Sequence, residues 1–339
     1  MSASEDSIPE KLLGWYDRHA RALPWRSPPG KASPEPYRVW LSEVMLQQTT
    51  TAAVAPYYAK FLGIWPSVEA LAKADDADVM AAWAGLGYYS RARNLLAAAR
   101  AVVARGGFPD TEDGLRALPG VGAYIAAAVA AIAFGRRAVV VDANVERVVS
   151  RLFAIAEPLP GARKAIRAAT DTITPDTRAG DFAQAMMDLG ATVCTPRDPR
   201  CLLCPLAADC AARGEGDPAR YPVKPAKKAN PVRQGVAYWH ERDGAVWLVR
   251  RPGTGMLGGM RALPDDGWSA KGDGSGRREG DWREAGLVRH GFTHFHLELT
   301  VVSSSNESPE GEGEWWPLDR LDEAGLPTLF AKAAARARA

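Results

Sequence analysis

The spacing of apolar side chains predicts two kinds of structure along the chain. From about residue 8 to residue 210, alanine and leucine recur every three or four positions between short Gly, Pro and Asp stretches, which predicts eight to eleven α-helices. Expected helices include Pro9–His19, Pro36–Gln48, Asp75–Ala84, Ser90–Arg105, Ala123–Phe134, Ala143–Ala154 and Asp181–Val193. Further along, the apolar period becomes two, which predicts strands at Val236–His240, Ala245–Arg250 and Thr293–Val302.

The change of period follows a proline-rich segment. Residues 221–234 carry three prolines and several cations but few apolar side chains, which is typical of an extended linker. We therefore expect a multidomain protein, with an all-α domain over residues 1–220 and a strand-containing domain over residues 235–339. In the expected strand 293–302, one face carries Phe295, Leu297, Leu299 and Val301, so this face should be buried.

Composition excludes several classes of protein. The 339 residues are 47% hydrophobic and 24% charged with a net charge of +2, which is ordinary for a folded globular protein and excludes wholesale disorder. The longest apolar run, Ile125–Phe134, is too short to span a bilayer, and the first residues lack the pattern of a signal peptide. We therefore expect a cytoplasmic protein without a membrane partner. Because the net charge is small, affinity for nucleic acid would have to come from local patches.

The cysteines point to one metal site. All four lie in the segment 194–210 with the spacing C-x6-C-x2-C-x5-C, namely Cys194, Cys201, Cys204 and Cys210. Four sulfur ligands suit either zinc or an iron–sulfur cluster, and the single CxxC with wide flanking gaps favours a 4Fe-4S cluster. Between the first two cysteines, Arg197 and Arg200 are expected to point outward. They could contact phosphate, or they could be an ordinary solvated charge pair.

A short Gly-rich turn could bind a phosphate. Gly120, Val121 and Gly122 lie in the sequence LPGVG, between an amphipathic segment and the apolar run that begins near Ala123. Backbone N–H groups in such a turn, next to a helix N-terminus, can bind a DNA phosphate without reading sequence. The alternative is a simple connection between two helices.

Two carboxylates lie in unlike surroundings. Glu43 is in the middle of the apolar segment Val39–Gln48, where burial would raise its pKa towards that of a general acid; alternatively it is a helical Glu that faces water. Asp142 precedes the expected helix 143–154 and is a natural N-cap, whose bonds to backbone N–H groups would keep it ionised. An acid beside an anion is what cleavage of a glycosidic bond requires.

Together these segments resemble one family. WLSEVMLQQT, GLGYYSRARN, LPGVGAYIAA, VDANVERV, MMDLGATVC and the cysteine spacing are similar to the adenine DNA glycosylases of the endonuclease III superfamily, the MutY family. The resemblance covers nearly the whole chain. It implies an all-α helix-hairpin-helix domain with a 4Fe-4S cluster, followed by a Nudix-like α/β domain that recognises the lesion. It also implies removal of adenine mispaired with 8-oxoguanine or guanine in double-stranded DNA, by a monomer at the bacterial nucleoid.

The resemblance also implies roles for catalytic residues. Glu43 would protonate adenine N7, Asp142 would stabilise the sugar cation, and Asn144 would orient water and the carboxylates. Bifunctional relatives that cut the strand have a Schiff-base lysine two residues after the hairpin glycine, where this chain has Tyr124. Because tyrosine cannot form the imine, we expect a monofunctional enzyme. Two alternatives are a strand-cutting enzyme like endonuclease III and a non-catalytic DNA-binding protein whose cluster senses redox state.

Further roles concern DNA and base recognition. Gln47 and Gln48 would wedge into the duplex, and Tyr88 would intercalate beside the oxidised guanine. Without the resemblance, the two glutamines would be interpreted as solvated side chains at a helix end and Tyr88 as a core aromatic residue. Gln184 lies where some relatives place an acidic residue in the adenine pocket. In RHGFTHFHL, the lesion loop would consist of Phe292, Thr293 and His294, with Thr293 replacing the family's serine. Residues 264–288 lack the acidic helix of a working Nudix hydrolase, so pyrophosphate hydrolysis is not expected.

Overall fold

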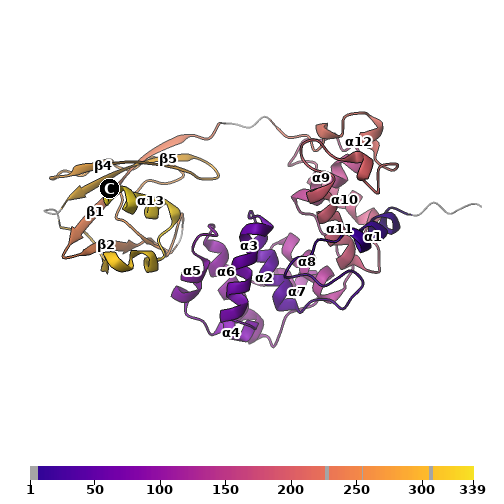
Figure 1. The fold of residues 1–339 in the computed structure, drawn as a ribbon, viewed down its shortest axis with the longest axis horizontal. Helices are drawn as coiled ribbons and strands as arrows, with labels where there is room; N and C mark the ends of the chain where they lie inside the picture. Colours follow the sequence, from indigo (N-terminus) through magenta and orange to yellow (C-terminus); the bar gives the residue numbers. More distant parts are fainter. Residues whose placement is uncertain (1–6, 226–228, 254, 305–307) are drawn as a thin grey trace, which may run out of the picture. The chain divides into compact units, whose positions relative to one another are not determined.

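The chain divides into two compact units. The structure is a computed structural model that describes residues 7–225, 229–253, 255–304 and 308–339. The first unit holds Met1–Lys73 and Asn94–Ala226, and the second holds Ala74–Arg93 and Lys227–Ala339 (Figure 1). No described helix is both long and apolar enough to cross a membrane.

Helices dominate the first 220 residues. They are α1 (Ile8–His19), α2 (Pro36–Leu46), α3 (Thr51–Ile64), α4 (Val68–Ala72), α5 (Asp76–Trp83), α6 (Ser90–Ala104), α7 (Glu112–Arg116), α8 (Ala123–Phe134), α9 (Ala143–Leu152), α10 (Arg163–Ile173), α11 (Ala179–Thr192) and α12 (Ala211–Gly214), with short 3-10 turns η1 (Cys201–Leu203) and η2 (Pro218–Arg220). Eleven α-helices therefore lie within residues 8–210, all of which are described, which confirms the expected range of eight to eleven.

Helix α8 is central to the first unit. It forms where the sequence is apolar on every side, and every residue from Ile125 to Ala133 is buried. It contacts α2, α7 and α11. Glycines allow α11 to approach closely: a Cβ on Gly180 would lie 2.5 Å from the Ala131 carbonyl oxygen, and one on Gly190 would lie 2.7 Å from Asn144 Cβ. The tight packing holds α2, α8, α9 and α11 together, and these helices carry the candidate catalytic residues.

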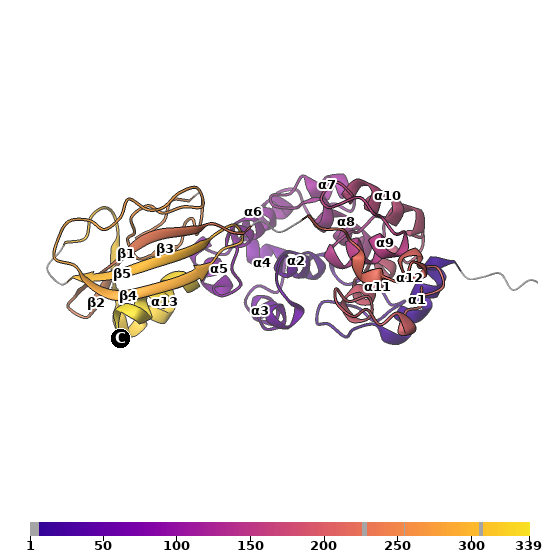
Figure 2. The same cartoon turned by 90° about the horizontal axis from the view of Figure 1, so that it is seen from above.

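The second unit is built on a mixed sheet. Its strands are β1 (Val232–Arg242), β2 (Ala245–Arg250), β3 (Arg261–Ala262), β4 (Arg283–Gly291), β5 (His296–Ser304) and β6 (Glu314–Pro317), followed by η3 (Leu318–Ala324) and α13 (Thr328–Ala337). The order is β3-β2-β1-β5-β4, with β6 paired to β2; β1 and β5 are parallel, and the other pairs are antiparallel. Strands β1, β5 and β4 lie side by side in Figure 2. Helix α13 packs on β4 and β5.

One face of β5 is buried as its sequence pattern predicts. Phe295, which precedes the strand, and Leu297, Leu299 and Val301 are at most 1% exposed. Together with Phe330 of α13 they form part of the apolar core between sheet and helix. Alternation of apolar residues thus identified the core face correctly.

Three boundaries differ from the sequence predictions. Strand β1 begins at Val232, inside the expected linker, because Val232–Gln234 pair with His296–Glu298 of β5. Strand β5 begins at His296, so Thr293 and His294 lie in the preceding turn. The segment Ala74–Arg93, expected in the all-α domain, groups with the second unit. Specific contacts connect it there, since Arg93 donates to the Gly258 carbonyl oxygen.

Candidate active site

Helix α2 places Glu43 in a buried position. The helix begins at Pro36, where the Glu35 side chain caps it by accepting a hydrogen bond from the Tyr37 N–H (3.1 Å). Every residue from Val39 to Met45 is buried, and Glu43 is only 5% exposed. The expected burial of this carboxyl is therefore confirmed, and the alternative of a Glu that faces water is wrong.

Tyr124 bonds directly to this carboxyl. Its hydroxyl, from the first turn of α8, donates to Glu43 Oε2 at 2.6 Å. The pKa of Glu43 is raised to about 7, chiefly by burial; the Tyr124 hydrogen bond and the Arg26 charge act against this rise, and the Asp142 charge adds to it. A carboxyl with this pKa is partly protonated at neutral pH, as a general acid must be.

Asp142 caps α9, as its sequence position predicts. Its Oδ1 accepts hydrogen bonds from the N–H groups of Asn144 (2.9 Å) and Val145 (2.7 Å). Its Oδ2 accepts from the Asn144 side-chain amide at 2.9 Å. The positive end of the helix dipole and three donors thus favour an anion at this position. Because Asp142 also acts on the pKa of Glu43, the two carboxyl groups belong to one site.

Arg147 holds Asn144 in place. Arg147, 9% exposed, donates to Asn144 Oδ1 (2.9 Å) and to the carbonyl oxygens of Gly190 (2.6 Å) and Cys194 (2.7 Å). The amide of Asn144 is therefore oriented with its nitrogen towards Asp142. Hydrogen bonds connect the carboxylate, through Asn144 and Arg147, to the backbone of the first cysteine.

The four cysteines line one cavity. It is lined by Cys194, Cys201, Cys204 and Cys210 together with Arg151 and Arg213. Among the described residues, no three His, Cys, Asp or Glu side chains are arranged to hold a single metal ion. Four sulfur donors around a common space nevertheless fit an iron–sulfur group in both donor type and number.

The hairpin turn agrees only in part with the prediction. Gly120 has φ +70°, and a Cβ there would lie 2.5 Å from Asn94 Cβ, so only glycine fits. Gly122 is the N-cap of α8 and is exposed. Val121, however, is buried and donates its N–H to the Leu118 carbonyl oxygen at 3.2 Å. The turn itself therefore uses the Val121 N–H, and phosphate binding by this hairpin stays a prediction.

Other predicted contact residues differ in exposure. Gln48 is exposed with φ 56°, a left-handed conformation that is uncommon outside glycine, and Gln47 is half-buried at the end of α2. Arg197 and Arg200 are both exposed, as expected. Gln184 is 5% exposed, and its side-chain nitrogen donates to the Gly180 carbonyl oxygen (3.2 Å), so its amide faces its own helix.

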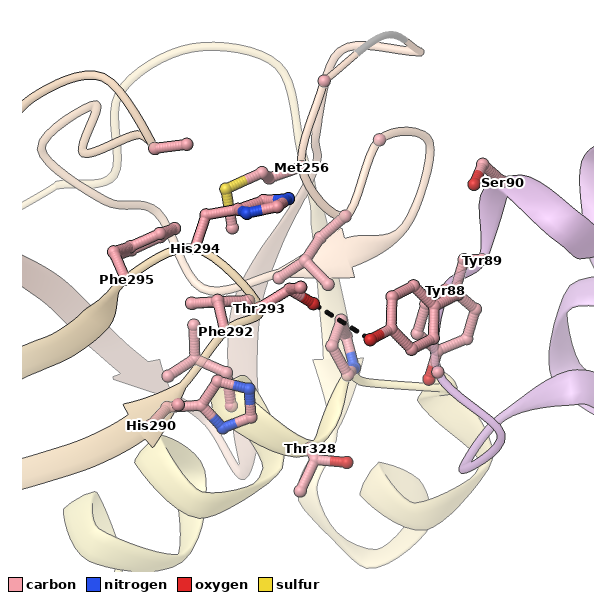
Figure 3. A pocket seen from close by; sticks show the side chains of 18 of the residues that line it. Tyr88, Tyr89, Ser90, Met256, His290, Phe292, Thr293, His294, Phe295 and Thr328 are labelled. Atoms are coloured by element: carbon pink, nitrogen blue, oxygen red, sulfur yellow. Dashed lines mark hydrogen bonds between the residues drawn. The ribbon is translucent and has the colours of Figure 1, made fainter. Parts of the chain in front are cut away.

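The expected lesion residues line a cavity of about 440 Å³ in the second unit. Tyr88 is 47% exposed with φ 50°, and its hydroxyl lies 2.9 Å from Thr293 Oγ1. Figure 3 shows the two side chains pointing toward one another, with Phe292 and His290 beside Thr293. The Phe292 ring stacks on Phe295, with 4.7 Å between centroids. Exposed His294 lies in the turn before β5, although the sequence predicted a strand over residues 293–302.

Comparison with known proteins agrees with this arrangement. Residues 41–174 match the model of the HhH-GPD superfamily base excision DNA repair proteins, and residues 235–336 match the NUDIX domain. The adenine DNA glycosylase of Buchnera aphidicola subsp. Schizaphis graminum is 34% identical, with 95% of this chain and 96% of that protein covered. The chain belongs to the adenine DNA glycosylase family.

Longer members of the adenine DNA glycosylase family also match. The human protein is 37% identical over 76% of this chain, and the Arabidopsis thaliana protein is 36% identical over 86%. The chain spans 57% and 52% of these two proteins, so a little over half their length.

Solved structures show the helical fold of the adenine DNA glycosylase family in other enzymes. A thermostable thymine-DNA glycosylase matches with a TM-score of 0.54 and 29% identity, covering 61% of this chain and 95% of that chain. A trapped endonuclease III–DNA intermediate matches with a TM-score of 0.51, covering 61% of this chain and 94% of that one. The second, at 22% identity, supports the fold alone.

Sequence reasoning missed Arg26, whose charge acts on Glu43, and the buried aspartate that binds Arg26. Asp188 of α11 is fully buried and accepts hydrogen bonds from Arg21 Nε (2.6 Å) and from an Arg26 terminal nitrogen (2.8 Å). Arg26 in turn lowers the pKa of Glu43. A single Asp among the apolar residues of MMDLGATVC was the available signal.

Sequence reasoning also missed the residue that supports Tyr88. Arg91, 8% exposed, donates to the carbonyl oxygens of Leu86 (3.1 Å) and Gly87 (3.3 Å). Its guanidinium also lies 5.5 Å from the Tyr88 ring centroid. It therefore stabilises the turn in which Tyr88 adopts its left-handed conformation.

Proposed function

We propose that this protein is a monofunctional DNA glycosylase that hydrolyses the N-glycosidic bond of adenine mispaired with 8-oxoguanine or guanine. One observation carries the proposal: Glu43 has a pKa of about 7, bonds to Tyr124 and lies beside Asp142, which caps α9. An acid that is about half protonated at neutral pH and a nearby hydrogen-bonded carboxylate are the two groups that this reaction needs.

The chemistry divides between the two carboxyl groups. Adenine leaves the duplex, and Glu43 donates its proton to adenine N7, which makes the base a better leaving group. The positive charge that develops on the sugar is stabilised by Asp142, which Asn144 holds through its side-chain amide. Water then adds to the sugar carbon and leaves an abasic site. Tyr124 carries no amine, so strand cleavage through an imine is not part of this mechanism.

Exposed residues on several elements would bind the duplex. Gly120 and Gly122 in the hairpin would hold one phosphate, and Arg197 and Arg200 on the cysteine loop would hold others. The exposed side chains of Gln48 and Tyr88 would enter the base stack. Both residues have positive φ, and strained backbone of this kind is often found where a side chain must be aimed at a ligand.

Recognition of the oxidised guanine would involve the second unit. Thr293 retains a hydroxyl where the family has serine, and this hydroxyl contacts the Tyr88 hydroxyl. Exposed His294 and half-buried Phe292 lie in the same turn as Thr293. Gln184 would face the adenine only if its bond to Gly180 is broken, so its role is secondary in this proposal.

A 4Fe-4S cluster would be held by Cys194, Cys201, Cys204 and Cys210. When bound, it would supply a cross-link within the loop 194–210 and a redox-active centre. The same loop carries Arg197 and Arg200, so loss of the cluster should weaken DNA binding.

A single-turnover assay with A:8-oxoguanine, A:G and A:T duplexes tests the proposed activity. We expect adenine release from the two mispairs, with strand scission only after alkali, and none from A:T. The Glu43→Gln variant should bind the duplex and release no adenine; excision at the wild-type rate would refute the assignment of the acid. A stable adduct after borohydride treatment would instead support an enzyme that cuts the strand, and binding without release of any base would support a non-catalytic DNA binder.

A further inference from the structure

The buried guanidinium of Arg151 has no carboxylate partner among the described residues. Arg151 lies on α9 and is 2% exposed. Its nitrogens donate to the carbonyl oxygens of Thr195 (2.7 Å), Pro196 (3.2 Å) and Tyr221 (3.1 Å). Each of these acceptors is neutral. A cation that is taken out of water and bonded only to neutral groups is strongly destabilising unless a negative charge lies nearby.

The cysteine cavity supplies the missing negative charge. Arg151 lines this cavity together with all four cysteines. One of its terminal nitrogens lies 3.3 Å from Cys194 Sγ, and its carbonyl oxygen lies 3.5 Å from Cys210 Sγ. Thiolates that bind metal leave a net negative charge on the metal–sulfur group. Among the described residues no carboxylate pairs with this guanidinium, so a metal–sulfur group in the cavity would supply its counter-charge.

Two other arginines near the cysteines differ from Arg151. Arg147, one turn earlier on α9, connects through Asn144 to the carboxylate of Asp142. Arg213 lines the same cavity but is exposed, and it donates to the Ala207 carbonyl oxygen at 3.0 Å. Arg151 combines burial, contact with a cysteine sulfur and, within the part of the chain that the structure describes, the lack of an acidic partner.

We propose that Arg151 is a positioning residue for the iron–sulfur site. Its charge offsets the negative charge of the thiolates, and its planar fork holds the backbone at Thr195 and Pro196, next to the ligand Cys194. The inference rests on the proposed cluster. Two consequences can be separated: the charge favours the reduced form of the cluster, because reduction adds negative charge, and the fork slows loss of the metal by holding the loop.

Full-length protein in four forms separates these effects. They are the wild type, Arg151→Gln, Arg151→Lys and the control Arg213→Gln. Arg151→Gln should release iron to a chelator about tenfold faster or more, with a more negative reduction potential. Arg151→Lys should keep the potential near the wild-type value but still release iron faster, because an ammonium cannot form the fork. Arg213→Gln should match the wild type in both measurements.

The outcomes separate failure of the Arg151 proposal from failure of the proposed cluster. Wild-type protein that lacks iron and visible absorption refutes the cluster and therefore the premise. If the wild type holds the cluster and Arg151→Gln matches Arg213→Gln in iron release and potential, the inference is wrong. If Arg151→Gln does not fold, Arg151→Lys decides: faster iron release than Arg213→Gln supports the role of the fork, and equal release overturns it.

Discussion

Replacing Tyr124 by phenylalanine should move the alkaline limit of activity to higher pH. The hydroxyl donates to Glu43 Oε2 at 2.6 Å and so stabilises the charged carboxylate. A hydrogen bond to a charged group contributes about 1.5–3 kcal/mol, and one pKa unit corresponds to about 1.4 kcal/mol. Loss of the bond should therefore raise the Glu43 pKa, already about 7, by about 1–2 units. Because the protonated acid is the active form, the ratio of the excision rate at pH 8 to the rate at pH 6 should be about five- to tenfold higher in Tyr124→Phe than in the wild type.

The assay is single-turnover excision from an A:8-oxoguanine duplex between pH 5 and pH 9, with abasic sites revealed by alkali. Tyr37→Phe is the matched control, since it removes a buried hydroxyl of α2 that donates to the Trp65 carbonyl oxygen at 2.8 Å. Its alkaline limit should match that of the wild type. An alkaline limit for Tyr124→Phe that stays in place or moves to lower pH would show that the Tyr124 hydroxyl does not control the protonation of Glu43.

Three further predictions test other parts of the structure. The folded-state pKa of Glu43 is about 7 against an ordinary 4.5, so its stabilising contribution is complete below about pH 4.5 and is lost as pH rises through 7. In urea unfolding, the free energy of unfolding of the wild type should therefore fall between pH 5 and pH 8 by about 2–3 kcal/mol more than that of Glu43→Gln. Gly120→Ala should lower the free energy of unfolding by at least about 1 kcal/mol, because its φ is +70°, whereas Gly122→Ala, where a Cβ meets open space, should leave stability unchanged; equal effects on stability would contradict the argument. Thr293→Val should reduce the preference for A:8-oxoguanine over A:G about two- to tenfold, and Thr328→Val, in the same cavity, should leave this ratio unchanged.

Features that depend on neighbouring residues were predictable from the sequence. The apolar run predicted α8 at Ala123–Phe134, and these are the observed bounds. The position of Asp142 before a helix predicted its N-cap bonds, and the alternation in β5 predicted the buried face. Helix periodicity, capping and strand alternation each involve residues only a few positions apart. The order of strands was not predictable, since β1 pairs in parallel with β5, which is distant in sequence.

The candidate site also combines features that the sequence determined with features that only the fold decided. The sequence by itself determined which residues could act: an acid within an apolar helix, a capping Asp and four closely spaced cysteines. Only the tertiary structure decided that Glu43 meets Tyr124, 81 positions away, and that Arg26 is held near it by Asp188. Local patterns arise from covalent spacing, whereas a pKa depends on desolvation and on charges that folding brings close from any distance along the chain. For the same reason, no sequence pattern marked Arg151 as a buried cation without a carboxylate partner in the described part of the chain.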